Sequence, residues 1–202
     1  ALSSGSAVSA TAAVTPAPAA TARRGRALIW TAVALLIAAA GGLAMLSACH
    51  LRIRKQLATL ARLEHHLPEH GHDDDARAAA RAILRYFDTA AVHHHEDEEA
   101  SLLPRLVARV TEARALADRL MREHGELAER WRRLRPLLSG IAAGQRAVLP
   151  PKLVREIAAA YHAHIELEES ELIPLAREAL PADEVATIGR EMAERRGVAV
   201  AA

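Results

Sequence analysis

The sequence is poor in cysteine and in aromatic residues. Its 202 residues include one Cys, two Trp, two Tyr and one Phe. A single cysteine excludes an intramolecular disulfide framework and fits a reducing compartment. With so few aromatic side chains, the core must be built mainly from Leu, Ala, Val and Ile, a composition that suits helices. A Gly-rich phosphate loop and a convincing strand–turn–strand pattern are also missing, so neither a nucleotide loop nor a β-sheet is predicted.

The sequence also lacks a strong net charge. The formal net charge is +1 at pH 7, and residues of both signs are mixed along the chain. No long basic stripe is interleaved with aromatic residues, which excludes nucleic acid as the main partner. Histidine, in contrast, is abundant: the chain has eleven.

The first part of the chain differs in composition from the rest. Residues 1–26 are Ala, Ser, Thr and Pro followed by the basic RRGR, and we expect a disordered tail there. Residues 27–49 contain no charge and are long enough to span a bilayer. They end in Leu-Ser-Ala-Cys, which resembles a lipoprotein signal.

Other features of this apolar run argue against a membrane anchor. The run is rich in alanine, and Gly41-Gly42 interrupts it. Apolar residues at helical spacing also continue from Leu43 through the supposed cleavage point. We therefore expect residues 27–42 to be an apolar leader of a cytoplasmic protein, with a membrane-anchored chain as the alternative.

Four long segments and one short segment have apolar residues at helical spacing. The long segments cover about residues 43–67, 73–109, 111–138 and 152–180, and the short one covers 182–196. Pro104 predicts a kink or a break in the second segment. Because the connections are short, the fold class is all-α. We expect an up-down antiparallel four-helix bundle over residues 43–180, with a short C-terminal helix and tail in residues 181–202.

Histidine and glutamate stand where these helices should be apolar, and their pattern is repeated. HHEDEEASLLP (94–104) matches HIELEESELIP (164–174) at an offset of 70 residues, and the first His, the adjacent Glu-Glu pair and the Pro of the pattern are kept in both copies. A lone histidine precedes each copy, His50 in the first half and His124 in the second. Residues four apart on a helix lie on one face, about 6 Å from each other. Each half is thus predicted to be a helical hairpin that presents two imidazoles and one carboxylate to the centre.

This pattern predicts a metal site. One histidine among apolar residues is usually an ordinary buried polar group. Four histidines on the apolar faces of four helices, with two repeated glutamates beside them, are not explained in this way. An unpaired buried carboxylate costs several kcal/mol, and a cation compensates for it. Six ligands are too many for one tetrahedral zinc, whereas imidazoles with bridging carboxylates suit two iron or manganese ions. The candidate ligands are His50, His94, Glu98, His124, His164 and Glu168.

The residues CHLRI (49–53), HHHEDEEASLLP (93–104), EHGEL (123–127) and HIELEESELIP (164–174) together resemble the hemerythrin-like (HHE cation-binding) domain family. The resemblance implies a four-helix bundle with a non-haem di-iron centre, that is, two iron ions. Carried over by match, the six candidates would be its ligands, and Glu98 and Glu168 would bridge the irons.

One position departs from the family pattern. The oxygen-carrying members have a second histidine four residues after the one on the third helix, and here that position is Ala128. Water, a neighbour such as His95, or another group is left as the missing ligand. We expect a protein that binds or senses oxygen, nitric oxide or iron. The alternatives are a di-iron peroxidase or catalase-like enzyme acting on peroxide, and a membrane-tethered sensor.

Some neighbours of the candidate ligands are expected to lie off the buried face. His93 and His95 point about 100° to either side of His94, and we expect them to be mainly exposed, with a hydrogen bond to a ligand as the alternative. Glu99 and Glu169 are repeated but are rotated off the apolar face, so we expect them beside the ligands or in solvent. We expect Cys49 to be a small packing residue rather than a reactive thiol.

Overall fold

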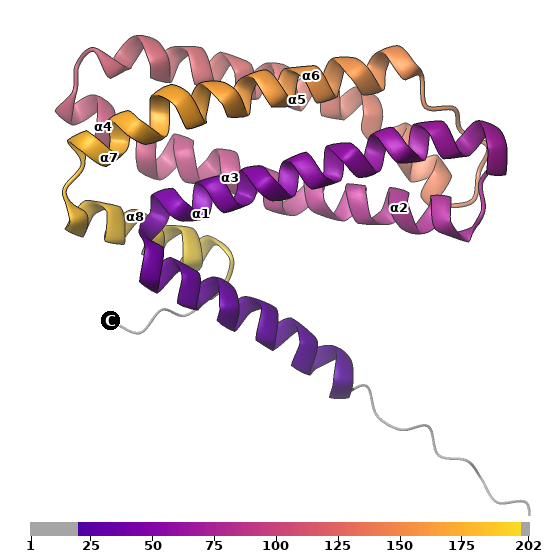
Figure 1. The fold of residues 1–202 in the computed structure, drawn as a ribbon, viewed down its shortest axis with the longest axis horizontal. Coiled ribbons are helices and arrows are strands. Elements are labelled where there is room, and N and C mark those ends of the chain that lie inside the picture. The colour runs from indigo at the N-terminus through magenta and orange to yellow at the C-terminus, as the bar shows by residue number, and fades with distance from the viewer. Residues whose placement is uncertain (1–19, 199–202) are drawn as a thin grey trace, which may run out of the picture.

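The computed structural model describes the backbone of residues 20–198 and the side chains of residues 41–198. Every regular element in this part of the chain is helical, which confirms the all-α prediction (Figure 1). Residues 1–19 of the predicted tail lie outside it, and residues 20–26 belong to the first helix. The elements are α1 (Ala20–His70), α2 (Asp74–Arg85), η1 (Tyr86–Ala90), α3 (Ala91–Asp97), η2 (Glu98–Leu102), α4 (Leu103–Arg109), α5 (Ala113–Ala142), α6 (Pro151–Leu167), η3 (Glu168–Leu172), α7 (Ile173–Ala179) and α8 (Ala182–Arg195).

The helix α1 bends sharply at Gly41. This residue has φ 71° and ψ 171°, a conformation that glycine adopts far more readily than any other residue. At Gly42, a Cβ atom would lie 2.9 Å from Ile188 Cγ2 and 3.0 Å from the backbone nitrogen of Gly189. The glycine pair that interrupts the apolar run therefore lets α1 turn and lets α8 pack closely against it.

Two long helical runs contain a π-helical turn at the repeated motif. The N–H of Leu103 donates to the carbonyl of Glu98, and the N–H of Ile173 donates to that of Glu168, five residues back in each case. Proline lacks the N–H that an α-helix needs, and the wider turn ahead of it takes up the change in hydrogen-bond register. Of the kink or break expected at Pro104, the break does not occur, because the helical run continues from η2 into α4.

The helices α1, α2, α5 and α6 pack in a closed order. Contacts join α1 to α2, α2 to α5, α5 to α6, and α6 back to α1, and α8 contacts α1 and α3. Figure 1 shows the long runs side by side, with α8 beside the bend of α1 at one end. Within residues 41–198, no helix is long and apolar enough to cross a membrane. The predicted leader, residues 27–42, lies almost entirely outside this range.

The buried apolar residues form two clusters along the length of the molecule. The first includes Leu46, Leu102, Leu106, Leu120, Ile173, Ile188 and Met192. The second includes Ile53, Leu60, Ile83, Leu134, Leu138, Ile157 and Tyr161. On each of the four long runs the candidate ligands lie between the part that joins one cluster and the part that joins the other. A polar layer therefore crosses the interior at one level.

Candidate metal centre

The structure brings all six candidate residues together in this layer. Each side chain is at most 4% exposed. Four close approaches join their outermost atoms: His50 Nε2 to Glu168 Oε2 at 2.9 Å, His164 Nε2 to Glu168 Oε1 at 2.8 Å, His124 Nε2 to Glu98 Oε2 at 3.2 Å, and His94 Nε2 to Glu98 Oε1 at 3.6 Å. Residues from α1, α3, η2, α5, α6 and η3 thus converge on one point.

These converging atoms have no hydrogen-bond partner. The Nε2 atoms of the four histidines and both oxygens of the two glutamates are buried, and their short contacts lack hydrogen-bond geometry. Each buried polar group left without a partner costs about 1–3 kcal/mol. Four imidazole nitrogens and four carboxylate oxygens aimed at a common centre form a donor set that fits a cation, so the residues present fit a metal centre.

The ionisation of these groups also favours a cation. Burial and the adjacent Glu168 carboxylate raise the pKa of Glu98 well above its usual range. Burial acts on Glu168 in the same sense, but the imidazoles of His124, His164 and His50 outweigh it and lower the pKa of this carboxyl. The protein alone therefore supports one negative charge on the pair more easily than two. Burial lowers the pKa of His94 to about 3, which keeps its ring neutral and its lone pair available.

Three of the histidines have a carboxylate on the opposite side of the ring. The Nδ1–H of His50 donates to Glu169 at 2.5 Å, that of His124 to Glu99 at 2.7 Å, and that of His164 to Glu123 at 2.9 Å. A ring that donates from Nδ1 directs its Nε2 lone pair at the centre, the arrangement that is usual for metal-bound histidine. Glu99 and Glu169 therefore lie beside the candidate ligands, as expected.

The sequence reasoning missed Glu123. It directly precedes His124, so its side chain leaves α5 about 100° away, toward α6 and His164. The signal that could have found it is chemical: a ligand histidine usually has a carboxylate partner on its second nitrogen.

The carboxylate partners follow the internal repeat, with one exception. Glu99 in the first half binds a histidine of the second half, and Glu169 in the second binds a histidine of the first. By the same correspondence, Glu123 matches Cys49, because each directly precedes a lone histidine. The Nδ1 of His94, which matches the Nδ1 of His164, has no hydrogen-bond partner among the described residues. The two halves of the centre are therefore unequal outside the six candidate ligands.

The expectation that His95 is mainly exposed is wrong. Its Nε2 atom is buried and has no hydrogen-bond partner. Its ring lies at 11° to that of His124, with the centroids 4.1 Å apart. His93 is the partly exposed neighbour, and its Nδ1 lies 3.0 Å from Glu96. The buried face of a helix in a bundle is about 100° wide or more, so a residue one position past its centre still meets the next helix.

A third buried acid, Asp97, holds α8 beside the centre. Its side chain is fully buried and accepts hydrogen bonds from Arg195, and from Arg196 at 2.6 Å. Arg195 also donates to Ser101 in the π turn that begins at Glu98. The sequence pattern could not reveal this clamp of two arginines on Asp97. Arg195 and Arg196 lie 98 and 99 residues after Asp97 in the sequence, at the end of a different helix.

Comparisons with known proteins agree with this geometry. The sequence model described as "Hemerythrin HHE cation binding domain" matches residues 41–176, a range that holds all six candidates. A protein of Haemophilus influenzae (strain ATCC 51907 / DSM 11121 / KW20 / Rd), described as "Uncharacterized protein", is 33% identical over 154 residues. That match covers 76% of this chain and 89% of the relative. The chain belongs to the hemerythrin HHE cation-binding domain family.

Proposed function

We propose that the chain is an up-down antiparallel four-helix bundle that holds two iron ions in a non-haem centre, and that it binds or senses oxygen, nitric oxide or iron. The observation that carries this proposal is the convergence of four imidazoles and two carboxylates whose inner atoms are buried without hydrogen-bond partners. Membership of a cation-binding family supports the same function.

The number of ions is inferred from how the ligands group. One set of atoms that could hold a metal consists of His50, His94, Glu98 and Glu168, and another consists of Glu98, His124, His164 and Glu168. Both sets contain both glutamates. Bridging carboxylates are typical of two-ion sites, and imidazole with carboxylate suits iron. We therefore assign Glu98 and Glu168 as bridges and the histidines in pairs to the two ions.

The residues around the ligands have separate tasks in this function. Glu169, Glu99 and Glu123 hold three imidazoles in the tautomer whose Nε2 can bind metal. The two apolar clusters on either side keep bulk water out of the layer. The chemistry that iron would supply there is binding of a small diatomic ligand or electron transfer to it.

A surface cleft favours a second function, a di-iron peroxidase or catalase-like scavenger. The cleft has a volume of about 420 Å³ and lies between α4 and α5, with Leu103, Val107 and Met121 among its lining residues. Glu99 also lines it, and the same carboxylate accepts the hydrogen bond from His124. A carboxylate placed between a cleft and a ligand can hold or release a proton for a substrate such as peroxide.

The test of the proposed function is the iron content of the full-length protein, purified without a His tag. We expect about two irons per chain and a visible absorption band that changes on adding oxygen, peroxide or nitric oxide. No iron, or one zinc in a colourless protein, would contradict it. Turnover of peroxide by the iron-loaded protein would favour the enzyme. Recovery of the full chain in the membrane fraction would favour a sensor tethered through residues 27–49.

A further inference from the structure

The proposed centre has an uneven ligand supply at the ion beside α5. Ala128 stands one turn after His124, where the family resemblance leads one to expect a second histidine, and this alanine is exposed. The side chain of Ala128 carries no donor atom, so α5 offers a single imidazole. If this ion has a further protein ligand, a different helix must provide it.

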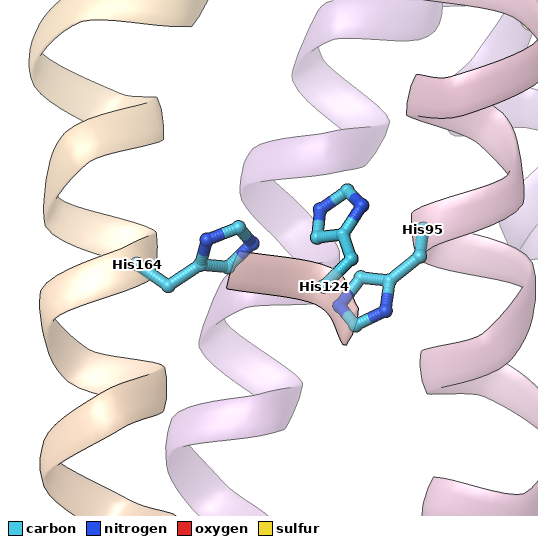
Figure 2. Close-up of side chains that lie close together, drawn as sticks. All are labelled: His95, His124 and His164. Atoms are coloured by element: carbon cyan, nitrogen blue, oxygen red, sulfur yellow. The ribbon is translucent and has the colours of Figure 1, made fainter. Parts of the chain in front are cut away.

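The helix α3 brings an imidazole to this place. Figure 2 shows His95, His124 and His164 reaching toward one another from three helices. One nitrogen of each ring lies within 4.8 Å of the corresponding nitrogens of the other two, so that the three could hold one metal ion. His95 thus stands beside the two histidines already assigned to the ion at α5.

Stacking alone does not account for the position of His95. The ring lies nearly parallel to His124, and it also lies at 19° to the ring of Tyr161 at 6.4 Å. These contacts explain the packing of the ring faces. They do not explain a buried Nε2 atom without a partner, because buried polar atoms are nearly always hydrogen-bonded or bound to an ion or water.

We propose that His95 is a protein ligand of the ion held by His124 and His164, so that α3 supplies the imidazole that α5 lacks. This inference rests on the proposed di-iron function. It divides five histidines unequally: His95, His124 and His164 serve one ion, and His50 and His94 serve the other. Both ions share Glu98 and Glu168.

The experiment compares His95→Phe with His93→Phe in the full-length protein. Phenylalanine keeps a flat ring that can stack on His124 but has no nitrogen, so the first variant separates ligation from stacking. The second changes the neighbouring histidine in the same way, at a partly exposed position outside the centre. Each protein is titrated with Co²⁺ and with Fe²⁺ without oxygen. The paramagnetically shifted, exchangeable imidazole N–H resonances of the Co²⁺ form are then counted.

We expect five shifted imidazole N–H resonances in the unmodified protein, one from each histidine assigned to an ion, and four in His95→Phe. We also expect one of the two ions to bind at least about 10-fold more weakly in His95→Phe, since even changes outside the ligand set typically cost 10–100-fold in affinity. His93→Phe should match the unmodified protein. Added imidazole should restore the lost affinity in His95→Ala, whose cavity can admit it.

The outcomes separate the inference from the function on which it rests. Two ions in the unmodified protein, with four shifted resonances or with unchanged binding in His95→Phe, would overturn the role of His95 and leave the di-iron function in place. Fewer than two ions in the unmodified protein would overturn both. The resonance count in the unmodified protein decides the question even if neither variant at position 95 folds.

Discussion

Replacing Glu98 by methionine is expected to have opposite effects on stability with and without metal. Both oxygens of this fully buried side chain lack hydrogen-bond partners, and burial together with Glu168 opposes its ionisation. Methionine has a similar volume and no group that needs a partner. In metal-free protein, Glu98→Met should therefore raise the free energy of unfolding by about 1–3 kcal/mol, the usual cost of an unsatisfied buried polar group.

With metal, the order should reverse. A ligand that binds only the folded state adds about 2.7 kcal/mol when its free concentration is 100 times its dissociation constant. Glu98→Met removes a carboxylate assigned to both ions, so the variant should lose most of this gain. Two such ions add about 5.4 kcal/mol, so the unmodified protein should then be the more stable of the two by about 2 kcal/mol or more.

The assay is urea unfolding followed by circular dichroism, once with a chelator and once with Fe²⁺ in the absence of oxygen. Leu102→Met is the matched control, because Leu102 is also fully buried and lies one turn further along the same helical run. Its cost should be below about 1.5 kcal/mol and equal under both conditions. If Glu98→Met were less stable than the unmodified protein by the same amount in both, Glu98 would be a structural acid and the reasoning would fail.

Four further predictions concern the surroundings of the centre. Glu99→Gln and Glu169→Gln should each weaken metal binding by about 10–100-fold in a chelator-competition titration, and no change in either would remove their role in orienting histidines. Burial lowers the folded-state pKa of His94 to about 3, so in metal-free protein its contribution to stability is present above about pH 6.5 and is lost as pH falls toward 3. Urea midpoints should therefore depend less on pH in His94→Gln, and equal slopes would contradict this. Asp97→Asn should cost about 3 kcal/mol, because two arginines of the α8 end lose their buried charge partner; thermal unfolding measures it, and an unchanged melting temperature would refute it. Cys49→Ser should leave the iron content unchanged, whereas loss of iron would make Cys49 part of the site.

The helices and the six central residues could be predicted because both depend on regular spacings in the sequence. A period of 3.6 residues decides which face of a helix is buried, and His50, His94, His124 and His164 all fall on such a face. The match between residues 94–104 and 164–174 then marks Glu98 and Glu168 as special. This information is local to each helix and needs no knowledge of how the helices pack.

The remaining parts of the centre depend on packing between helices. The hydrogen bond from His164 to Glu123 requires a particular offset of α6 against α5, and the clamp on Asp97 requires that α8 fold back over α3. The position of His95 depends on the space beside His124. The π turns shift the register by one residue, a change that periodicity counted along a regular α-helix does not contain. The spacing of residues along one helix determines none of these packing arrangements.

The polar layer that crosses the interior means that this molecule has two apolar compartments rather than one continuous core. One includes the α8 end of the molecule and the other includes α2 and most of α5. Amide hydrogen exchange would therefore be governed by two cooperative units whose coupling passes through the layer of imidazoles and carboxylates. With cations bound in that layer we expect the two units to unfold together, and without them we expect the α8 end to open first. The centre would thus stabilise the packing of the two apolar clusters against each other, in addition to any chemistry that it supports.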